Sequence, residues 1–391
     1  MKDISIFFEP GFIPESIPEE NLLNDTLAKS VDYHNASGFP SLEGIEIAII
    51  GVHEERLAYN NQGCASGADQ VRKYLYALAL SGYQPKIADL GNIKAGATIE
   101  DTWYALSQSL AFLIRRNIFP IIIGGSQDLT YANYLAYEKL EQTVNMVTID
   151  SRLDLGAIEE EISSRTYLGK IILHQPNYLF NYCNIALQTH FSDAKTLDLM
   201  DKLYFDNFRL GEIRKDITQT EPLIRNADVL SFDIGALRFS EAPGNGNASP
   251  NGLFGEEACQ MCRYAGMSDK LTSAGFYELN PKLDSRGQTS HLVAQMIWYL
   301  MDGYYNRKKD YPIGDKALFT KYRVAGVNTD HEIIFYKSNR SDRWWMDVPY
   351  PPDKRLKFER HHMVPCSYAD YQTASEGEMP DLWWKTYQKL S

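Results

Sequence analysis

The chain has 391 residues, a formal net charge of -12 and a hydrophobic content of 44%. That hydrophobic content is ordinary for a globular protein with a core, and the length allows one large domain or two smaller ones. The negative charge argues against nucleic acid and against an anionic membrane surface as partners, because both favour lysine and arginine. No apolar run approaches the roughly 18 residues that a membrane-spanning helix needs, so we expect no membrane span.

The cysteine count and the N-terminus indicate the compartment. There are five cysteines, and an odd number fits a reducing environment better than a disulfide framework. Residues 1–12 contain acidic residues and a proline, whereas a signal peptide has a basic and then an apolar stretch. We therefore expect a cytoplasmic protein.

The first part of the chain reads as an extension followed by alternating strands and helices. Residues 1–44 contain four prolines and show no clear period, so we predict a segment that wraps the main domain, with short helical pieces around 19–32. Thr98 and Asp101 are spaced as in a capping box at the start of a helix. The other elements expected here are strands at 45–52 and 86–91 and a helix at 66–81.

The segment 119–156 organises the predicted site. Apolar runs at 121–123 and 144–149 flank a helical stretch, and each run ends in a polar cluster, GGSQD or DSRLD. A third run, 229–234, ends in the same way. Because the carboxyl ends of parallel strands meet at one edge of a sheet, the polar side chains should line one crevice. These side chains are Gln127, Asp150, Arg152, Asp154 and Asp233.

Alternating strands and helices continue to about residue 308. The stretch 155–225 is mixed, and we interpret 170–176 and 184–189 as strands and 210–217 as a strand or loop followed by a helix. Further on, the expected elements are helices at 254–265 and 286–306 and a strand at 273–281. This alternation predicts a three-layer α/β fold with a mainly parallel central sheet.

Residues 309–391 have a different character. They hold four of the six tryptophans. The stretch 331–349 predicts a β-hairpin with its turn at Ser338 and Asn339, and the remainder looks irregular. We favour packing of this extension on the main domain. The alternative is an interface with a second subunit or another protein, because aromatic residues are enriched at interface cores. The predicted organisation is an N-terminal extension (1–44), a main domain (45–308) and a C-terminal extension (309–391).

Five motifs, in order, resemble the ureohydrolase family, which includes arginase, agmatinase and formimidoylglutamase. The similarity is greatest to the formimidoylglutamase branch and covers roughly 45–308. TIDSRLDLG is similar to the family's DAHxD motif, and SFDIGALRFSEAPG to its SxDxDxxDPxxxPG motif. The other three stretches are NQGCASGADQVRKYL, FPIIIGGSQDLTYANYLAYE (similar to the GGDH region) and YELNPKLDSRGQTSHLVAQM. The resemblance implies an arginase-like three-layer fold.

The resemblance also implies a metal site in which several ligands are missing. Members of the family hold two manganese ions through six side chains, and the two ions activate a bridging water. The six matching positions are Gln127, Asp150, Arg152, Asp154, Asp233 and Gly235. Arginine is a permanent cation and glycine has no side chain, so neither can bind a metal. One metal site would keep its carboxylates, and the other would be lost.

Two hypotheses follow for the cluster. We favour a salt-bridge cluster in which Arg152 reaches Asp154 or Asp233 in the volume of a manganese ion, with no cofactor. The alternative is one manganese or other divalent ion held by Asp150, Asp154 and Asp233. Glu278 matches a position that contacts substrate in the family, although a strand-end glutamate also commonly accepts hydrogen bonds from loop N–H groups.

The expected function follows from these losses. We predict a non-catalytic ureohydrolase-fold protein, a pseudoenzyme with a scaffold or binding role, and assign no residue a catalytic role. The alternative is a single-metal hydrolase of C–N bonds in a guanidino or formimino compound. A protein partner or a homo-oligomer could form through the C-terminal extension.

For three weaker features we expect structural roles rather than functional ones. Cys259 and Cys262 are expected to be buried helix thiols, because no second pair or nearby histidine completes a zinc site. His361 and His362 are expected at the surface or in packing. The loop 244–252 should form the rim of the pocket.

Overall fold

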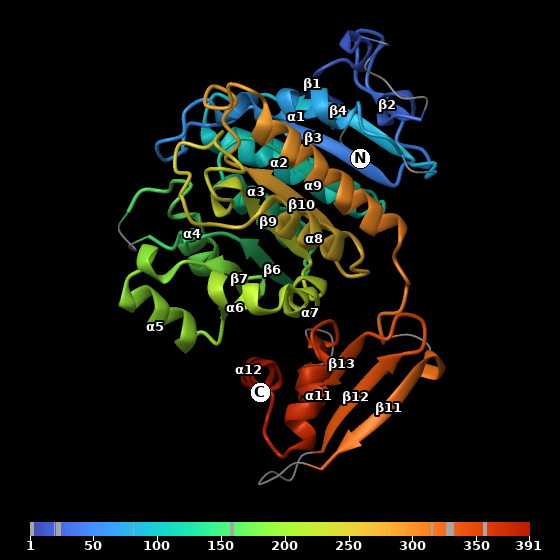
Figure 1. Cartoon of the computed structure of the whole chain (residues 1–391), viewed down its shortest axis with the longest axis vertical. Helices are drawn as coiled ribbons and strands as arrows, with labels where there is room; N and C mark the ends of the chain where they lie inside the picture. Colours follow the sequence, from blue (N-terminus) through green and yellow to red (C-terminus); the bar gives the residue numbers. More distant parts are fainter. Residues whose placement is uncertain are drawn as a thin grey trace.

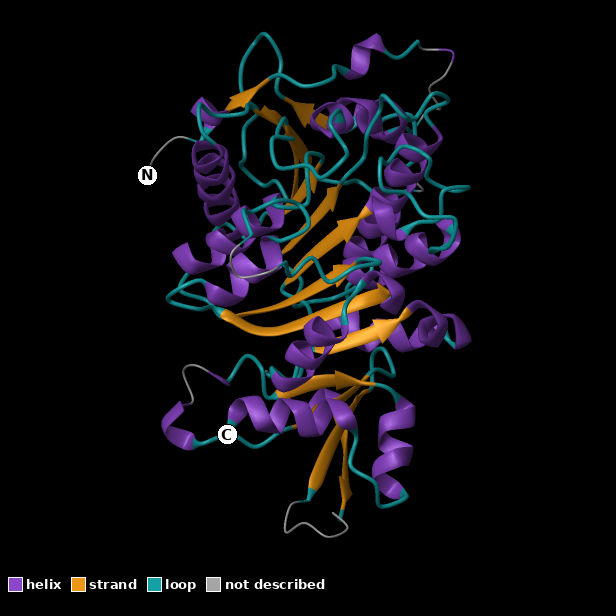
Figure 2. Cartoon of the chain, turned by 90° about the vertical axis from the view of Figure 1, so that its left-hand side faces the viewer, coloured by secondary structure: helices purple, strands orange, loops and turns teal. Residues whose placement is uncertain are grey.

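The computed structural model describes residues 4–18, 20, 25–80, 82–156, 160–313, 316–325, 332–354 and 358–391. In these residues the chain forms a large, mainly parallel sheet covered by helices on both faces, and a smaller antiparallel sheet near the C-terminus (Figures 1 and 2). The predicted three-layer α/β architecture is confirmed.

The large sheet has ten strands, and all neighbouring pairs are parallel except the pair that includes β1. In spatial order they are β1 (Phe8–Glu9), β4 (Ile87–Ile93), β3 (Ile47–Val52), β5 (Phe119–Ile123), β10 (Ser273–Tyr277), β9 (Val229–Asp233), β6 (Val144–Ile149), β7 (Leu179–Leu187) and β8 (Asp206–Arg209). The tenth strand, β2 (Val31–Tyr33), pairs with β4. Parallel neighbours require crossover connections, which the helices supply.

Both faces of this sheet are buried, which explains the continuous apolar runs of its strands. Every residue of β3 is buried, and successive side chains enter different cores: Ile47 and Ile49 join one apolar cluster, and Ala48 and Ile50 join the other. The alternation follows from the two-residue period of a strand.

The helices divide between these two cores. The helices α2 (Ile99–Ile114), α3 (Leu129–Lys139), α4 (Tyr167–Leu173) and α5 (Ala194–Lys202) contribute to the core that holds Ile50. The helices α1 (Gly67–Leu75), α6 (Leu210–Lys215), α7 (Thr220–Arg225), α8 (Gly255–Gly266) and α9 (Gln288–Tyr305) contribute to the other core. The capping box at Thr98 is confirmed, since its side chain accepts from the Asp101 N–H and the Asp101 carboxylate accepts from the Thr98 N–H. Among the described residues the 3-10 helices are Ser5–Phe7, Pro14–Ser16, Leu27–Lys29, Cys64–Ser66, Thr189–Phe191, Ile217–Gln219, Ile234–Ala236, Lys316–Leu318 and Pro352–Lys354.

Several predicted elements were wrong. The segment 170–176, expected as a strand, lies largely in α4, and 210–217 begins as helix α6. A short apolar run does not distinguish a strand from a buried helical turn. The helix expected at 66–81 ends at Leu75. The N-terminal extension adds the edge strands β1 and β2, and of the helical pieces expected around 19–32 only Leu27–Lys29 is present among the described residues, with 19 and 21–24 outside them.

The C-terminal part forms a four-stranded antiparallel sheet (Figure 1). Its strands are β11 (Phe319–Val324), β12 (Ile333–Ser338), β13 (Trp344–Asp347) and β14 (Met363–Cys366), and it carries the helices α11 (Tyr368–Ser375) and α12 (Asp381–Leu390). The predicted hairpin is confirmed as β12 and β13, which are antiparallel. The expectation of an irregular remainder is wrong. None of the described helices is both long and apolar enough to cross a membrane.

Candidate metal centre

Four neighbouring strands of the large sheet place the predicted residues at one edge. The strands β5, β10, β9 and β6 are adjacent in that order. Gln127 follows β5, Glu278 follows β10, Asp233 ends β9 and Asp150 follows β6. Because all four strands are parallel, their carboxyl ends meet, as the sequence predicted.

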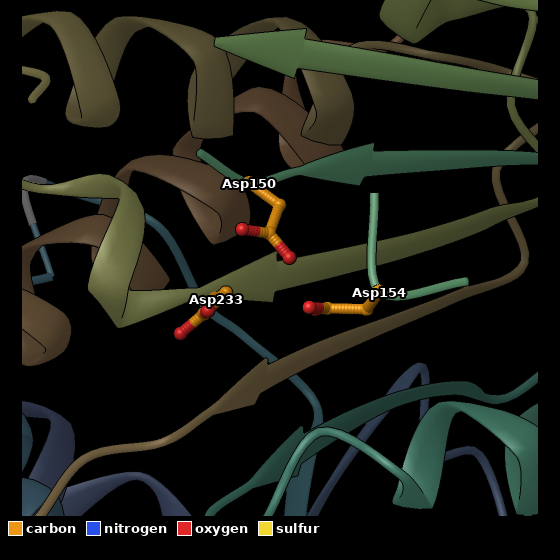
Figure 3. A group of neighbouring side chains, drawn as sticks. All are labelled: Asp150, Asp154 and Asp233. Atoms are coloured by element: carbon orange, nitrogen blue, oxygen red, sulfur yellow. The ribbon is translucent and has the colours of Figure 1, made fainter. Parts of the chain in front are cut away.

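Three aspartates form the centre of the site. Asp150, Asp154 and Asp233 each offer a carboxylate oxygen, and these oxygens lie within 4.8 Å of one another (Figure 3). Backbone N–H groups fix two of them: Arg152 N–H donates to Asp150 at 2.9 Å, and Gly235 N–H donates to Asp233 at 2.7 Å. Among the described residues, no other group of three or more acidic, histidine or cysteine side chains could hold a metal ion.

Burial raises the pKa of all three carboxyls. Burial, followed by the charge of Asp154, raises the pKa of Asp150 well above its usual range. Burial raises the pKa of Asp154 to about 7, and burial together with the charge of Asp150 raises that of Asp233 to about 8. Buried carboxyls without a cation retain protons in this way, whereas a cation would favour their charged forms. Protons and a cation would therefore compete for the same three carboxylates.

The side chain of Gln127 can supply either a hydrogen-bond donor or a ligand. One terminal atom of its amide lies 3.1 Å from Oδ2 of Asp154 and 3.2 Å from Oδ2 of Asp150. A nitrogen in this position donates to both carboxylates, and the amide oxygen then accepts from the Tyr167 hydroxyl at 3.2 Å. Half a turn of the amide would place its oxygen toward the aspartates. Gln127 therefore suits the protonated cluster in one orientation and a cation in the other.

Arg152 does not lie where we expected it. Its guanidinium carbon is 3.8 Å from the centre of the Phe191 ring, and no ion pair joins Arg152 to Asp154 or Asp233 in the described part of the chain. The Arg152 N–H donates to Asp150 in this turn, and the Arg152 side chain points to the rim of the cavity. There the face of the Phe191 ring attracts its guanidinium. The predicted salt bridge in the metal volume is therefore wrong. The charges of Arg165 and Arg152 still lower the pKa of Asp233 against the stronger effect of burial.

Gly235 has no side chain at the position that the family resemblance matches to a metal ligand. A Cβ added to Gly235 would lie 3.1 Å from Oδ2 of Asp233 and 3.4 Å from Nδ2 of Asn245, so a larger side chain would crowd both. The cavity beside the aspartates has a volume of about 10 Å³, which is roughly the size needed for a single water or ion. It is lined by Gln127, Ser151, Arg152, Asp154, Ser164, Arg165, Asp233, Gly235, Asn247 and Glu278.

Glu278 combines both roles considered for it. It lines the cavity, and its carboxylate accepts from the Gln127 N–H at 2.9 Å and from Nδ2 of Asn61 at 2.7 Å. Burial, followed by the charge of Asp233, raises its pKa to about 7. Its φ of +69° lies in the left-handed region that non-glycine residues seldom adopt. Such local strain is common at functional sites.

Sequence reasoning missed several supporting residues. Asn61 holds Glu278, and Tyr167 reaches Gln127 from α4. Asn245 donates to the Glu278 carbonyl at 3.0 Å from the loop expected as the rim. The asparagine-rich composition of that loop was the available signal for Asn245, whereas nothing in the sequence singled out Tyr167.

The weaker candidates behave as expected from the sequence. Cys259 and Cys262 are buried, and burial raises the pKa of both thiols, to about 12 for Cys259. Of the two roles expected for His361, the structure shows packing: the side chain is buried and stacks on Phe180 with ring centres 3.9 Å apart. It serves packing between the C-terminal sheet and the body of the protein.

Comparisons with known proteins agree with this architecture. Residues 45–302 match the model of the arginase family. Formimidoylglutamase from Streptococcus gordonii is 23% identical over 307 residues, which cover 72% of this chain and 92% of that protein. Formiminoglutamase from Trypanosoma cruzi, solved with Mn2+, is 22% identical with a TM-score of 0.63 and covers 68% of this chain and 96% of its own. Formimidoylglutamase from Bacillus subtilis has a TM-score of 0.65 at 18% identity, covering 73% and 93%.

These findings correct one expectation. We expected no cofactor, on the ground that an arginine had replaced a metal ligand and neutralised the aspartates. The similar protein from Trypanosoma cruzi was solved with Mn2+. In this chain Arg152 lies over Phe191 and leaves the three carboxylates facing one another. The expectation of a cofactor-free cluster is therefore overturned.

Proposed function

This chain belongs to the arginase family, and on that premise we propose that it holds one divalent cation, not two, and acts as a cation-dependent binding protein rather than as a hydrolase. The carrying observation is the convergence of three aspartate oxygens within 4.8 Å beside a cavity of about 10 Å³. That volume matches one ion or water.

The donor set fits a hard cation. Carboxylate and amide oxygens suit manganese and magnesium, and Asp150, Asp154 and Asp233 supply the carboxylates, with the Gln127 amide as a fourth oxygen. The raised pKa values of Asp154 and Asp233 have the same implication, because bringing a cation to these carboxyls removes the reason for them to retain protons.

A second cation lacks ligands of its own. Arg152 and Gly235 stand at the two positions that would belong to it in the family resemblance, and neither can donate a lone pair. Asn245 lies against the place where a side chain of residue 235 would begin. The remaining carboxylates would have to hold two divalent ions alone, and their mutual repulsion would be only partly relieved.

The absence of a second site favours binding over hydrolysis. In two-metal hydrolases the pair of cations acidifies the attacking water and clamps the reacting group. The cavity beside the aspartates has a volume of about 10 Å³, whereas a small-molecule substrate site usually needs hundreds of cubic ångströms. Arg152 also lines this cavity, and its positive charge would repel a cationic guanidino group.

A second candidate function rests on Glu278. Its pKa is raised to about 7, which suits a group that gives or takes a proton near neutral pH. The similar proteins named above are formimidoylglutamases. A single-metal hydrolase of a C–N bond in a formimino compound would use Glu278 to hold a proton beside the cation, after Arg152 and Arg165 had moved to admit the compound.

Metal content tests the main proposal. Protein purified with manganese should retain about one equivalent per chain, measured by mass spectrometry of the metal, and Asp154→Asn and Asp233→Asn should lose it. Asp198→Asn is the matched control, because Asp198 is exposed and pairs with Lys202 at the surface. Two equivalents in the unaltered protein would contradict the proposal.

Activity separates the two candidates. The manganese-loaded protein should release no urea, formamide or ammonia above background from arginine, agmatine or formimidoylglutamate. Saturable release that Asp233→Asn and Glu278→Gln both abolish would establish the single-metal hydrolase and refute the binding role.

A further inference from the structure

A second hollow lies outside the metal centre and is lined by residues of α3, α4 and α5. Figure 1 shows where these three helices lie in the fold. The volume of the hollow is about 660 Å³, within the range of small-molecule sites. The described residues around it are Tyr131, Leu155, Gly156, Glu160, Ile162, Thr166, Gly169, Lys170, Ile172, Leu173, His174, Leu199 and Leu203. None of the residues of the metal cluster lines it.

The walls of this hollow are mainly apolar and partly open to solvent. Leu173 at the end of α4 is 57% exposed, and Leu199 on α5 is 40% exposed. Two large side chains from different helices therefore face one hollow without covering each other. Exposed leucines scattered singly need no explanation, but apolar side chains gathered around a cavity commonly mark a binding site.

One wall carries a cation without a carboxylate partner. The Lys170 ammonium lies 4.6 Å from the centre of the Trp103 ring and 5.1 Å from that of Tyr131. In the described part of the chain no acidic side chain forms an ion pair with Lys170. The aromatic faces hold the ammonium in place but leave its charge uncompensated, so an anion of the ligand can complete the site.

Hydrogen bonds within the protein fix the polar side chains on one wall of the hollow. The Tyr131 hydroxyl is 3.0 Å from Nδ1 of His174, and Nε2 of His174 is 3.2 Å from the Glu138 carboxylate. The ring of Tyr131 also meets the edge of Trp103, with centres 5.2 Å apart. These contacts set the two rings against which Lys170 rests. Glu138 is occupied by His174, and Glu160 lies at the rim beside Gly156.

We propose that this hollow binds a free monocarboxylate with an aliphatic tail, its head on Lys170 and its tail against Leu173, Leu199 and Leu203. The uncompensated ammonium selects the anionic head, and the leucines of α4 and α5 select the tail. The volume admits a chain of medium length. The inference does not depend on the metal centre, because the two sites share no lining residue.

Calorimetry with decanoate, below its micelle concentration, tests the proposal on the full chain. We expect saturable binding of decanoate at one site. Decanol, which lacks the charge-assisted contact, should bind at least about tenfold more weakly. Acetate, which lacks the apolar tail, should also bind at least about tenfold more weakly. Lys170→Gln and Leu199→Asn should each weaken decanoate binding by a similar factor. Lys202→Gln is the matched control for Lys170→Gln, since Lys202 lies on α5, is 70% exposed and pairs with Asp198.

A footprint on the unaltered protein avoids any effect of substitution on folding. An amine-acetylating reagent should modify Lys170 less as decanoate is added, with the same half-saturation as the heat signal, while modification of Lys202 stays constant. The proposal is overturned if decanoate does not saturate, if decanol binds equally well, or if Lys170 is not protected. It is also overturned if anionic vesicles or a second copy of the chain, and not decanoate, protect Lys170.

Discussion

The guanidinium carbon of Arg152 lies 3.8 Å from the centre of the Phe191 ring, although Asp154 and Asp233 line the same cavity as Arg152. Cation–π contact at a half-exposed rim holds the arginine without neutralising the carboxylates. The side chain is near enough to influence them, because its charge lowers the pKa of Asp233, but it does not fill the space between them. Arg152 thus leaves the cluster open to a cation.

Replacing Arg152 by alanine should have a small effect on stability. The change removes a cation–π contact worth about 0.5–1 kcal/mol, whereas breaking a buried ion pair would cost about 3–5 kcal/mol. Urea denaturation of the metal-free protein measures the difference. A loss at the larger value would mean that Arg152 pairs with the aspartates in solution. Manganese affinity should rise in the same variant, because a nearby positive charge has been removed.

The metal-free protein should lose stability as pH rises. The pKa values of Asp154 and Asp233, about 7 and about 8 in the folded state, lie above those of an unfolded aspartate. Between about pH 4 and pH 8 the folded state therefore binds more protons than the unfolded state, and its stability falls through this range. Denaturation with chelator present should show lower stability at about pH 8 than at about pH 5.

Manganese should reverse this trend. Binding requires ionised carboxylates, so affinity should increase from about pH 6 to about pH 8 and binding should release protons. Titration calorimetry in two buffers of different ionisation enthalpy counts those protons. Affinity that does not change across this range would show that the aspartates are already ionised without a cation.

Gln127→Glu should strengthen cation binding and lower the stability of the metal-free protein. The substitution replaces an amide that can donate to Asp150 and Asp154 by a fourth carboxyl in the same place. More ligand charge favours a divalent ion, and we expect affinity higher by on the order of tenfold. Without metal the extra carboxyl should lower the free energy of unfolding. Gln127→Leu, which can neither donate nor bind, should weaken both the metal-free protein and the complex.

The sequence predicted the arrangement of the site better than its contacts. Strand ends are marked by apolar runs, and parallel pairing then brings Gln127, Asp150 and Asp233 together at one edge. The position of Arg152 could not be derived in the same way, because it depends on Phe191, whose 3-10 helix follows a different strand. Helix α4 was missed because its apolar residues serve a buried helical face, with Tyr167, Leu168 and Ile171 inward.

Deleting residues 310–391 should make the protein aggregate or change its oligomeric state. The body would expose polar groups and rings that the C-terminal sheet now covers: Asp228 is fully buried and accepts from Arg360 at 2.5 Å, and Phe180 stacks on His361. Newly exposed apolar surface promotes association. Size-exclusion chromatography with light scattering measures the mass, and an unchanged mass and melting temperature would show that the extension is an independent appendage.

A single substitution at the same junction should test whether Arg225 attaches the C-terminal sheet to the main domain. Arg225 is 3% exposed; it pairs with Glu221 at 2.9 Å, donates to the Trp344 carbonyl at 3.2 Å and lies 4.3 Å from the centre of the Trp345 ring. Arg225→Ala should cost about 3 kcal/mol, the low end for a broken buried pair, because Glu221 keeps Arg343 at 3.1 Å. Arg323→Ala, in an exposed pair with Glu332, should cost less than about 1 kcal/mol. Urea denaturation followed by tryptophan fluorescence compares the two variants, and equal losses would mean that Arg225 does not hold the C-terminal sheet to the body.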